Sequence, residues 1–314
     1  MKKWLFFWTI LVLTLFAGIY LIIPSTIEIT SSKIANTSDN GTQRYLLDQA
    51  NWKIWWNYTH PSKVSNTSGG FTMNEDKYTL TSLFYKSADI TITHKNQVIT
   101  SKVVIIPVTQ DSTGIEWKCS LTPGYNPLNR INAYLEARKI KKNIDLVLTD
   151  LSAFLSKLEN VYGIHIERTN LKDTLFVTTK SIAKDKPSLN QIYGLIKNIQ
   201  SYITKKGIPQ SGNPIYNITQ LEDDQYQLMA GVPVNQNIPD ADGYSTKFMV
   251  KGSFMVTEVL GGDSSVNRAY RSLQQYFQDF RKTSMAMNFN MLVTDRQLQT
   301  DSSKWITKLY YPVY

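Results

Sequence analysis

The amino-acid sequence predicts an α+β protein in which an apolar N-terminal helix precedes two folded domains, and three patterns support this prediction. Residues 4–23 carry no charge. Residues 25–160 hold several strand-like runs followed by one long amphipathic helix, and residues 161–314 show the order strand, helix, strand, strand twice. The chain has 314 residues, of which 42% are apolar and 19% charged, a composition that suits about two globular domains.

The N-terminal run, WLFFWTILVLTLFAGIYLII, predicts a transmembrane signal-anchor over residues 1–24. Twenty apolar residues in a helix span about 30 Å, which is the thickness of a bilayer's hydrocarbon core. We find no convincing small-residue cleavage site, so an uncleaved anchor is favoured over a signal peptide. Lys2 and Lys3 precede the run, and this bias predicts a cytoplasmic N-terminus with the remaining chain outside the cytoplasm.

Charge and motif content argue against several classes of function. The formal net charge is +9, but the basic residues are scattered, and the densest run, ARKIKK (137–142), falls in a predicted helix where a solvated face is expected. We therefore expect no nucleic-acid partner. A single cysteine, Cys119, excludes an internal disulfide, and His60, His94 and His165 lack partners at metal-ligand spacing. No metal, cofactor or catalytic residue is predicted.

The first predicted domain, residues 25–160, begins with a strand and a helix rich in tryptophan. A turn, TPGYNP, then ends the run of strands, and Asn126 and Pro127 suit the start of a long helix that ends near Asn160. The predicted elements are a strand at 25–35, one or two short helices within 36–57, strands at 77–85, 89–96, 97–108 and 114–121, and the closing helix.

The tryptophan-rich element and the closing helix, NPLNRINAYL, resemble those of the SRPBCC (polyketide cyclase/START-like) superfamily. The matching residues are Asp48, Trp52, Trp55 and Trp56. This resemblance implies a helix-grip fold with an apolar cavity between the sheet and the long helix, and hence a hydrophobic ligand. The alternative is that the tryptophans only fill the core and its rim.

The second predicted domain, residues 161–314, contains a duplication. Its two repeats cover about 161–235 and 245–314, and each ends in a short strand with the pair Pro-Val, in LMAGVPV and KLYYPV. Proline inside a strand is unusual because it has no N–H for the ladder. The recurrence of strand, helix, strand and this proline at a spacing of about 77–79 residues indicates repeated halves.

Four segments of this domain resemble the gyrase-inhibitor-like (effector-binding) domain: GI…SGNP, YQLMAGVPV, NRAYRSLQQYF and DSSKWITKLYYPV. The resemblance implies pseudo-twofold symmetry and a cleft for small, often aromatic or cationic molecules. An acidic residue is typical of that cleft, but Lys308 stands at its position, and Met229 takes the equivalent place in the first repeat. The residues that we expect to bind the ligand are Tyr193, Met229, Tyr270, Trp305, Lys308 and Tyr310.

These observations favour a membrane-anchored, non-catalytic protein that binds or senses a small hydrophobic or aromatic molecule. Lys308 would repel a cation, so it suits an anionic ligand or none, and it removes the acid that the family's hydrolytic branch is proposed to use. Two alternatives stay open. One is a hydrolase that acts on a small hydrophobic or electrophilic compound, and the other is a scaffold whose cavities are filled by side chains.

Overall fold

The computed structural model describes residues 2–56, 58–59, 70–95, 97–171, 175–222, 224–241, 243–249, 252–284 and 286–313. His60, named above, lies outside these residues. The chain divides into two compact units, unit 1 (Met1–Val161) and unit 2 (Tyr162–Tyr314). Helices and antiparallel strands occur in both units, so the α+β class is confirmed.

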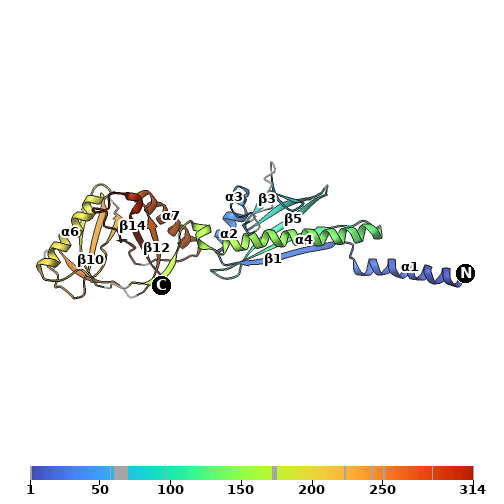
Figure 1. The fold of residues 1–314 in the computed structure, drawn as a ribbon, viewed down its shortest axis with the longest axis horizontal. Helices are drawn as coiled ribbons and strands as arrows, with labels where there is room; N and C mark the ends of the chain where they lie inside the picture. Colours follow the sequence, from blue (N-terminus) through green and yellow to red (C-terminus); the bar gives the residue numbers. More distant parts are fainter. Residues whose placement is uncertain are drawn as a thin grey trace. The chain divides into compact units, whose positions relative to one another are not determined.

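The N-terminal apolar run forms the helix α1 (Lys2–Ile22), coloured blue in Figure 1. Trp4, Phe6 and Trp8 are among its exposed side chains. Within the described residues, the structure contains no helix that is long and apolar enough to cross a membrane.

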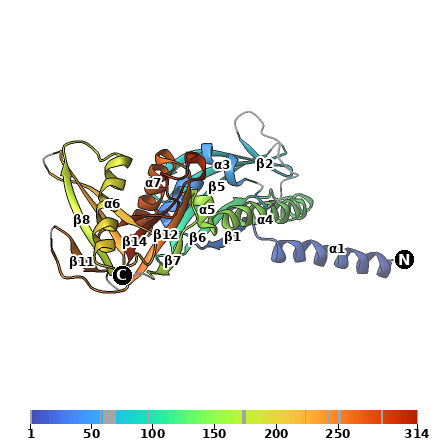
Figure 2. The same ribbon diagram turned by 60° about the vertical axis from the view of Figure 1, so that its left-hand side comes forward.

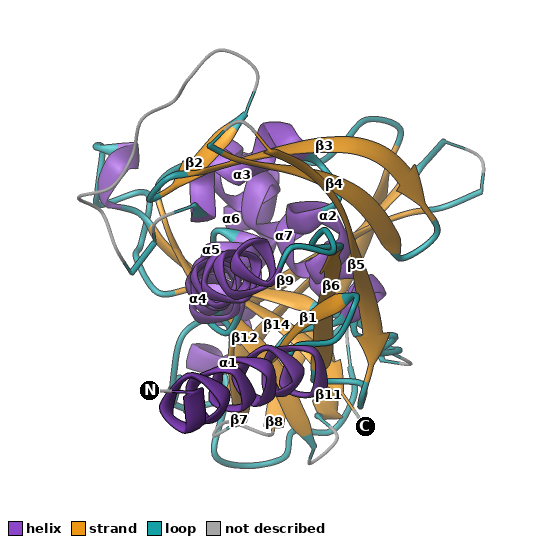
Figure 3. Ribbon diagram, turned by 90° about the vertical axis from the view of Figure 1, so that its right-hand side faces the viewer, coloured by secondary structure: helices purple, strands orange, loops and turns teal. Residues whose placement is uncertain are grey.

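Unit 1 consists of an antiparallel sheet and a long helix, α4, which the sheet curves around in the view of Figure 3. The strand order is β1-β6-β5-β4-β3-β2, so the first strand pairs with the last one. The elements are β1 (Ile27–Ala35), α2 (Asp39–Leu46), α3 (Gln49–Trp55), β2 (Phe71–Met73), β3 (Asp76–Phe84), β4 (Ser87–His94), β5 (Gln97–Pro107), β6 (Thr113–Leu121), α4 (Pro127–Leu155) and α5 (Leu158–Tyr162).

Local hydrogen bonds explain where these helices begin. The side chain of Asn126 accepts from the N–H of Leu128, and Pro127 occupies the first turn of α4, as the sequence predicts. Of the one or two short helices predicted within residues 36–57 the structure has two, because Asp48 caps a second start by accepting from the N–H of Ala50. The predicted helix end near Asn160 is also wrong, since α4 ends at Leu155 and α5 follows.

Large aromatic side chains fill the interior of unit 1. Trp52, Trp55, Trp117 and Tyr78 are fully buried, and the indole N–H groups of Trp52 and Trp55 donate to the carbonyls of Leu46 and Tyr45 at 2.8 and 2.9 Å. Trp52 and Trp56 stack with their ring centres 5.4 Å apart. The three tryptophans of the 36–57 segment therefore act as core residues.

Unit 2 is one antiparallel sheet of eight described strands with two helices, and Figure 2 shows it on the left. The strand order is β11-β8-β10-β9-β13-β14-β12-β7. The elements are β7 (Glu167–Asn170), β8 (Leu175–Ala183), α6 (Leu189–Lys205), β9 (Ile215–Gln220), β10 (Tyr226–Pro233), β11 (Ser245–Phe248), β12 (Ser253–Leu260), α7 (Asp263–Asp279), β13 (Phe289–Leu292), a 3-10 turn (Ser302–Lys304) and β14 (Ile306–Val313).

The two repeats meet in the centre of this sheet. At each edge of the sheet, the short strand that precedes one repeat pairs with a strand of the other repeat. The predicted order strand, helix, strand, strand is present twice, as β8-α6-β9-β10 and β12-α7-β13-β14, and β9 pairs with β13 at the junction. Each repeat also has a preceding short strand that the sequence did not indicate. The strand β7, before the first repeat, pairs with β12 of the second, and β11, before the second repeat, pairs with β8 of the first.

The register explains the two prolines. The N–H of Val234 donates to the carbonyl of Leu175 in β8, so Pro233, one residue earlier, directs its backbone nitrogen away from β8. On that other side the pairing with β9 has already ended, at Gly231. Pro312 likewise lies beyond Tyr310, the last residue of β14 that pairs with β13. The missing N–H therefore interrupts pairing with neither β9 nor β13, and opposite Pro233 lies Ser211, whose N–H donates to the carbonyl of Pro233 at 2.9 Å.

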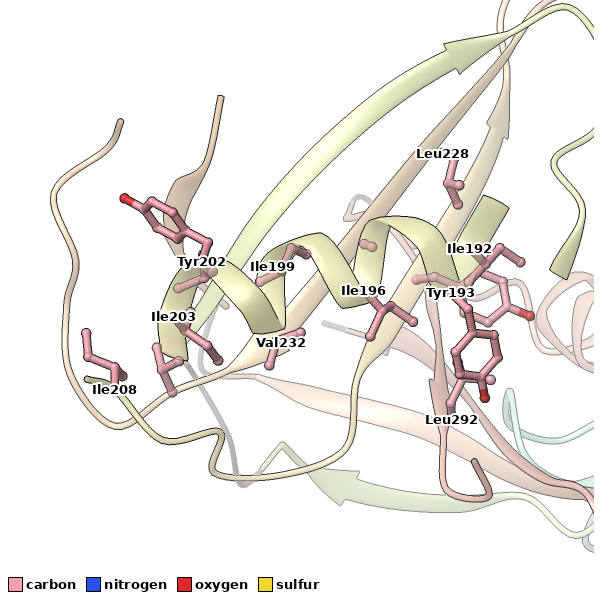
Figure 4. Close-up of a cluster of buried hydrophobic side chains, with 14 of the residues drawn as sticks. Ile192, Tyr193, Ile196, Ile199, Tyr202, Ile203, Ile208, Leu228, Val232 and Leu292 are labelled. Carbon is pink, nitrogen blue, oxygen red and sulfur yellow. The ribbon is translucent and has the colours of Figure 1, made fainter. Parts of the chain in front are cut away.

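The helix α6 covers the first repeat with a continuous apolar face, which Figure 4 shows against β10. Ser188 and Gln191 form a capping box at its start, and Gly207 adopts a φ of +69° just beyond its end. The buried members that the figure labels include Ile192, Ile196, Ile199, Tyr202, Ile203, Leu228 and Val232.

Candidate apolar binding site

The sheet of unit 2 has two buried faces, and only one is covered by helices. On the helix face, α6 lies over β8 and β10, and α7 lies over β12. Successive side chains of a strand point to opposite faces, so alternate residues belong to a second cluster. Its buried members are Phe176, Ile215, Phe254, Val256, Phe289, Met291 and Tyr310.

A cavity of about 240 Å³ opens on this second face. Both repeats contribute equivalent side chains, Phe176 from β8 and Phe254 from β12, and the junction strands contribute Ile215 and Phe289. Tyr310 stacks on Phe289 with ring centres 4.9 Å apart and meets Phe254 edge-on. The remaining aromatic and thioether residues of the lining are Tyr216, Phe248, Met229, Met249 and Met287.

The polar side chains at this cavity are few, and the most buried one is already paired. Asn217 is 5% exposed, its amide N–H donates to the carbonyl of Asn288 at 2.7 Å, and its amide oxygen accepts from the hydroxyl of Thr219. Among the described lining residues the charged one is Lys247, and none is an aspartate or a glutamate. The cavity can therefore accept apolar surface but offers no carboxylate to a ligand.

Three of the six predicted site residues belong to this face. Met229 lines the cavity, and Tyr310 lies against two of its phenylalanines. Lys308 shares their face but does not line the cavity, and its side chain is one-third exposed. Its ammonium lies 3.3 Å from the carboxylate of Glu258 on the neighbouring strand β12, so Lys308 sits in a surface ion pair.

The other three predicted residues lie on the helix face. The hydroxyl of Tyr193 accepts from the N–H of Arg296 at 2.8 Å. The indole N–H of Trp305 donates to the carbonyl of Gln299 at 2.7 Å, and the guanidinium of Arg296 lies 4.7 Å from its ring centre. These contacts hold Tyr193 and Trp305 within the packed protein. The six predicted residues therefore do not line one common cleft.

Tyr270, the sixth of these residues, lines a second cavity of about 620 Å³ beside the first turns of α6 and α7. Its ring meets Tyr311 edge-on at 5.4 Å. Burial raises the pKa of Tyr270 strongly, and burial also raises the pKa of Tyr216, which lines the same cavity. Both phenols are therefore neutral hydrogen-bonding groups rather than bases at ordinary pH.

Sequence reasoning missed Phe176, Phe254 and Lys247 of the apolar cavity. The two phenylalanines occupy positions 78 residues apart in the matching strands of the repeats, so an alignment of the repeats could have found them. Lys247 belongs to β11, which has only four residues. So short a strand shows no recognisable alternation of apolar and polar residues in the sequence.

A buried polar cluster in unit 1 contains His94, which has no partner at metal-ligand spacing in the sequence. His94 is 2% exposed, and its ring nitrogens contact Asp76 and, at 2.6 Å, Glu136 of α4. The amide of Asn143 donates to Asp76 at 2.8 Å. Hydrogen bonding to His94, and then to Lys95, lowers the pKa of Glu136 to about 2. Over the residues that the structure describes, no group of three side chains suits a metal ion.

Cys119 of β6 is a free, buried thiol in the same unit. Burial, aided by the negative charge of Asp76, raises its pKa to about 12. The thiol is therefore protonated and unreactive at neutral pH, which fits a structural side chain.

No family model matches this chain, and no curated protein matches it either. Among solved structures, the C-terminal domain of EcmrR is 14% identical and covers 48% of this chain and 98% of its own, with a TM-score of 0.42. EcmrR in a complex with DNA is 15% identical and covers 60% and 72%, with a TM-score of 0.44. SAV2435 bound to tetraphenylphosphonium is 16% identical and covers 48% and 94%, with a TM-score of 0.34.

These solved structures belong to the GyrI-like effector-binding group that the sequence of the second domain resembles. These three TM-scores are below 0.5 and the identities are below 25%, so the likeness decides neither the fold nor the ligand nor the activity of this chain. The topology of unit 2, with two βαββ repeats in one sheet, agrees with that fold on its own contacts. A membership of unit 1 in the SRPBCC superfamily is not shown.

Proposed function

We propose that unit 2 binds a small, largely apolar molecule in the cavity of about 240 Å³. One observation supports this above all: two repeats place phenylalanine and methionine side chains around a concave space on the sheet face that no helix covers. Ligand sites in proteins are typically concave, apolar and fixed by a few polar groups. Phe176 and Phe254 line the cavity from opposite repeats, and aromatic side chains suit contact with an aromatic ligand.

The lining favours binding over hydrolysis. Among its described residues there is no carboxylate, histidine or cysteine that could act as a base or nucleophile. Thr178, a hydroxyl at the cavity, already contacts the carbonyl and hydroxyl of Ser245. We therefore propose a non-catalytic binding or sensing role.

For unit 1 we propose a supporting role with an SRPBCC-like helix-grip topology. Its sheet order, with the first and last strands paired and one long helix alongside, supports that topology. Trp52, Trp55, Trp117 and Tyr78 occupy its interior, which favours the scaffold alternative for this unit over a second ligand site.

A bulky substitution at Gly252 tests the ligand site. Gly252 lines the cavity, and a Cβ added there meets no atom within 4 Å, so Gly252→Trp introduces a ring without a backbone clash. We expect the affinity of the full-length protein for 2-naphthamide, a neutral aromatic probe, to fall about tenfold or more by isothermal titration calorimetry, because the ring competes for the same space.

The matched control is Gly194→Trp. Gly194 is exposed on α6, an added Cβ there also meets nothing within 4 Å, and the residue does not line the cavity. Its affinity for 2-naphthamide should equal that of the unchanged protein. If the probe does not bind the unchanged protein, or binds both variants equally, the proposed site is wrong.

We further propose that α1 anchors the chain in a membrane with its N-terminus in the cytoplasm. The uncharged run of residues 4–23 in the full sequence and exposed rings such as Trp4 and Phe7 support this proposal, although the described residues of α1 alone are not long and apolar enough for a span. The protein should remain in the membrane fraction after a carbonate wash, and a fragment lacking residues 2–24 should not. Release of the full chain by carbonate would contradict the anchor, and protection of residues 25–314 from protease outside intact cells would contradict the orientation.

A further inference from the structure

We infer that the apolar cavity of unit 2 selects an anionic aromatic ligand, whose ring system lies among the phenylalanines and whose acid group lies beside Lys247. This inference rests on the proposed function and names the chemical class that the same site takes. The acid can be a carboxylate or a sulfonate, since either would meet the ammonium in the same way.

The position of Lys247 is the first reason. It lies in β11 directly opposite Phe176, so both side chains are on the cavity face of the sheet. Its ammonium nitrogen is 3.9 Å from the sulfur of Met229, another lining residue. The positive charge thus lies at the rim of the apolar surface, where an acid group can remain partly hydrated.

The lack of a counter-charge is the second reason. Within the described residues Lys247 has no carboxylate within 4.0 Å, and the lining contains no acidic side chain. Lys180 adds a further positive charge nearby, since it lies opposite Met229 in the ladder. Glu258 lies on the same face, but its carboxylate is 3.3 Å from Lys308.

These charges decide between ligands of similar shape. A cation in the cavity would gain from the faces of the phenylalanine rings but would be repelled by Lys247 and would leave water without a counter-ion. An anion of the same shape buries the same apolar surface and keeps its charge beside the ammonium. A site with this charge arrangement therefore prefers the anion.

Three naphthalene derivatives of nearly equal shape test this preference on the full-length protein: 2-naphthoate, 2-naphthamide and protonated 2-naphthamidine. At low salt we expect naphthoate to bind about tenfold more tightly than naphthamidine, with naphthamide between them, by isothermal titration calorimetry. The preference should shrink at 0.5 M NaCl, because an exposed ion pair is screened by salt.

Substitutions assign the preference to Lys247. Lys247→Gln should lower the affinity for naphthoate about threefold and leave that for naphthamide unchanged, and Lys247→Glu should reverse the order of the two charged ligands. Lys308→Gln is the matched control, because Lys308 is a lysine on the same face that does not line the cavity. It should change no affinity by more than about 1.5-fold.

The outcomes separate this inference from the function on which it rests. If naphthamide binds and Gly252→Trp prevents it, but the charged ligands bind equally, the site stands and the charge selection is overturned. The charge selection is also overturned if the preference for naphthoate over naphthamidine remains in Lys247→Gln or is lost in Lys308→Gln. If none of the three ligands binds, both the proposed function and this inference fail.

Discussion

Glu136 of α4 has a carboxylate that contacts three side chains with positive charge or N–H donors. Its oxygens are 2.6 Å from the ring of His94 and 3.1 and 3.3 Å from the ammonium groups of Lys95 and Lys139. These contacts, led by His94, lower the pKa to about 2 in the folded protein. A folded pKa below the unfolded one stabilises the fold above the unfolded pKa, and this contribution is lost as the pH falls toward 2.

Removing this charge should destabilise unit 1 in a pH-dependent way. We expect Glu136→Gln to lower the free energy of unfolding by about 1 kcal/mol at pH 7, because charge-assisted hydrogen bonds, including the one to the buried ring of His94, are lost. The loss should shrink between about pH 4.5 and pH 2, where Glu136 itself becomes protonated. Urea titrations followed by tryptophan fluorescence at pH 7, 4.5 and 2.5 measure this difference in the free energy of unfolding.

Glu116→Gln is the control for that experiment. Glu116 pairs with Lys118 at 2.7 Å on the exposed side of β6, so its removal should change stability by less than about 0.5 kcal/mol at every pH. Equal destabilisation by Glu136→Gln at pH 7 and pH 2.5 would show that the carboxylate charge does not contribute as described.

At the scale of the element, the register of β10 predicts that two adjacent positions respond oppositely to proline. Pro233 directs its backbone nitrogen away from β8, whereas Val232 is in the alternate position, where its N–H pairs with β8. Pro233→Ala should cost only about 0.4–1 kcal/mol, through the greater freedom of the unfolded chain. Val232→Pro should cost about 3 kcal/mol or more, because it removes a ladder hydrogen bond.

Guanidinium titrations of the full chain, followed by circular dichroism, measure both effects in the transition assigned to unit 2. Comparable losses for the two substitutions would contradict the register. Pro312→Ala repeats the test independently and should have the same small cost, since Pro312 occupies the equivalent position in β14.

The sequence predicted the elements whose signals are local. Asn126 with Pro127 at the start of α4 is a capping signal that needs no distant partner. The short strands β2, β7 and β11 were missed because three or four residues show no periodicity, and their pairing depends on strands elsewhere in the chain.

The candidate site was predicted only in part for a related reason. Met229 and Tyr310 were found from their place in the repeated strands. Tyr193 and Tyr270 belong to the helices α6 and α7, and Trp305 precedes β14, so their side depends on which face of the sheet the helices cover. Which face a strand residue occupies depends on its register, and a shift of one residue reverses it. Sequence patterns alone did not fix that register.

At the scale of the whole molecule, the exchanged strands predict which pieces of the chain can fold alone. We expect residues 25–161 and 162–314 each to unfold cooperatively in urea, because each has its own core. Residues 162–241 and 243–314 should each be unfolded by circular dichroism. In the first piece β7 would lack β12, in the second β11 would lack β8, and both would lose the junction of β9 with β13.

A cooperative transition from either half-length piece would show that the repeats are independent domains. Insolubility of residues 162–314 in the absence of residues 25–161 would show the converse, that the two units form one folding body. Mixing the two half-length pieces provides a further control, since recovery of structure only on mixing is what the exchanged strands require.

The exchange also affects how the chain folds during its synthesis. The strand β7 leaves the ribosome about 80 residues before β12, its partner, begins. At roughly 5–20 residues per second, β7 waits about 4 to 17 s without a neighbour. Its sequence, Glu-Arg-Thr-Asn, is polar and charged, as expected of a strand that must not pair with other chains in the meantime. Unit 2 can therefore complete its sheet only after β14, the last of its described strands, has been synthesised.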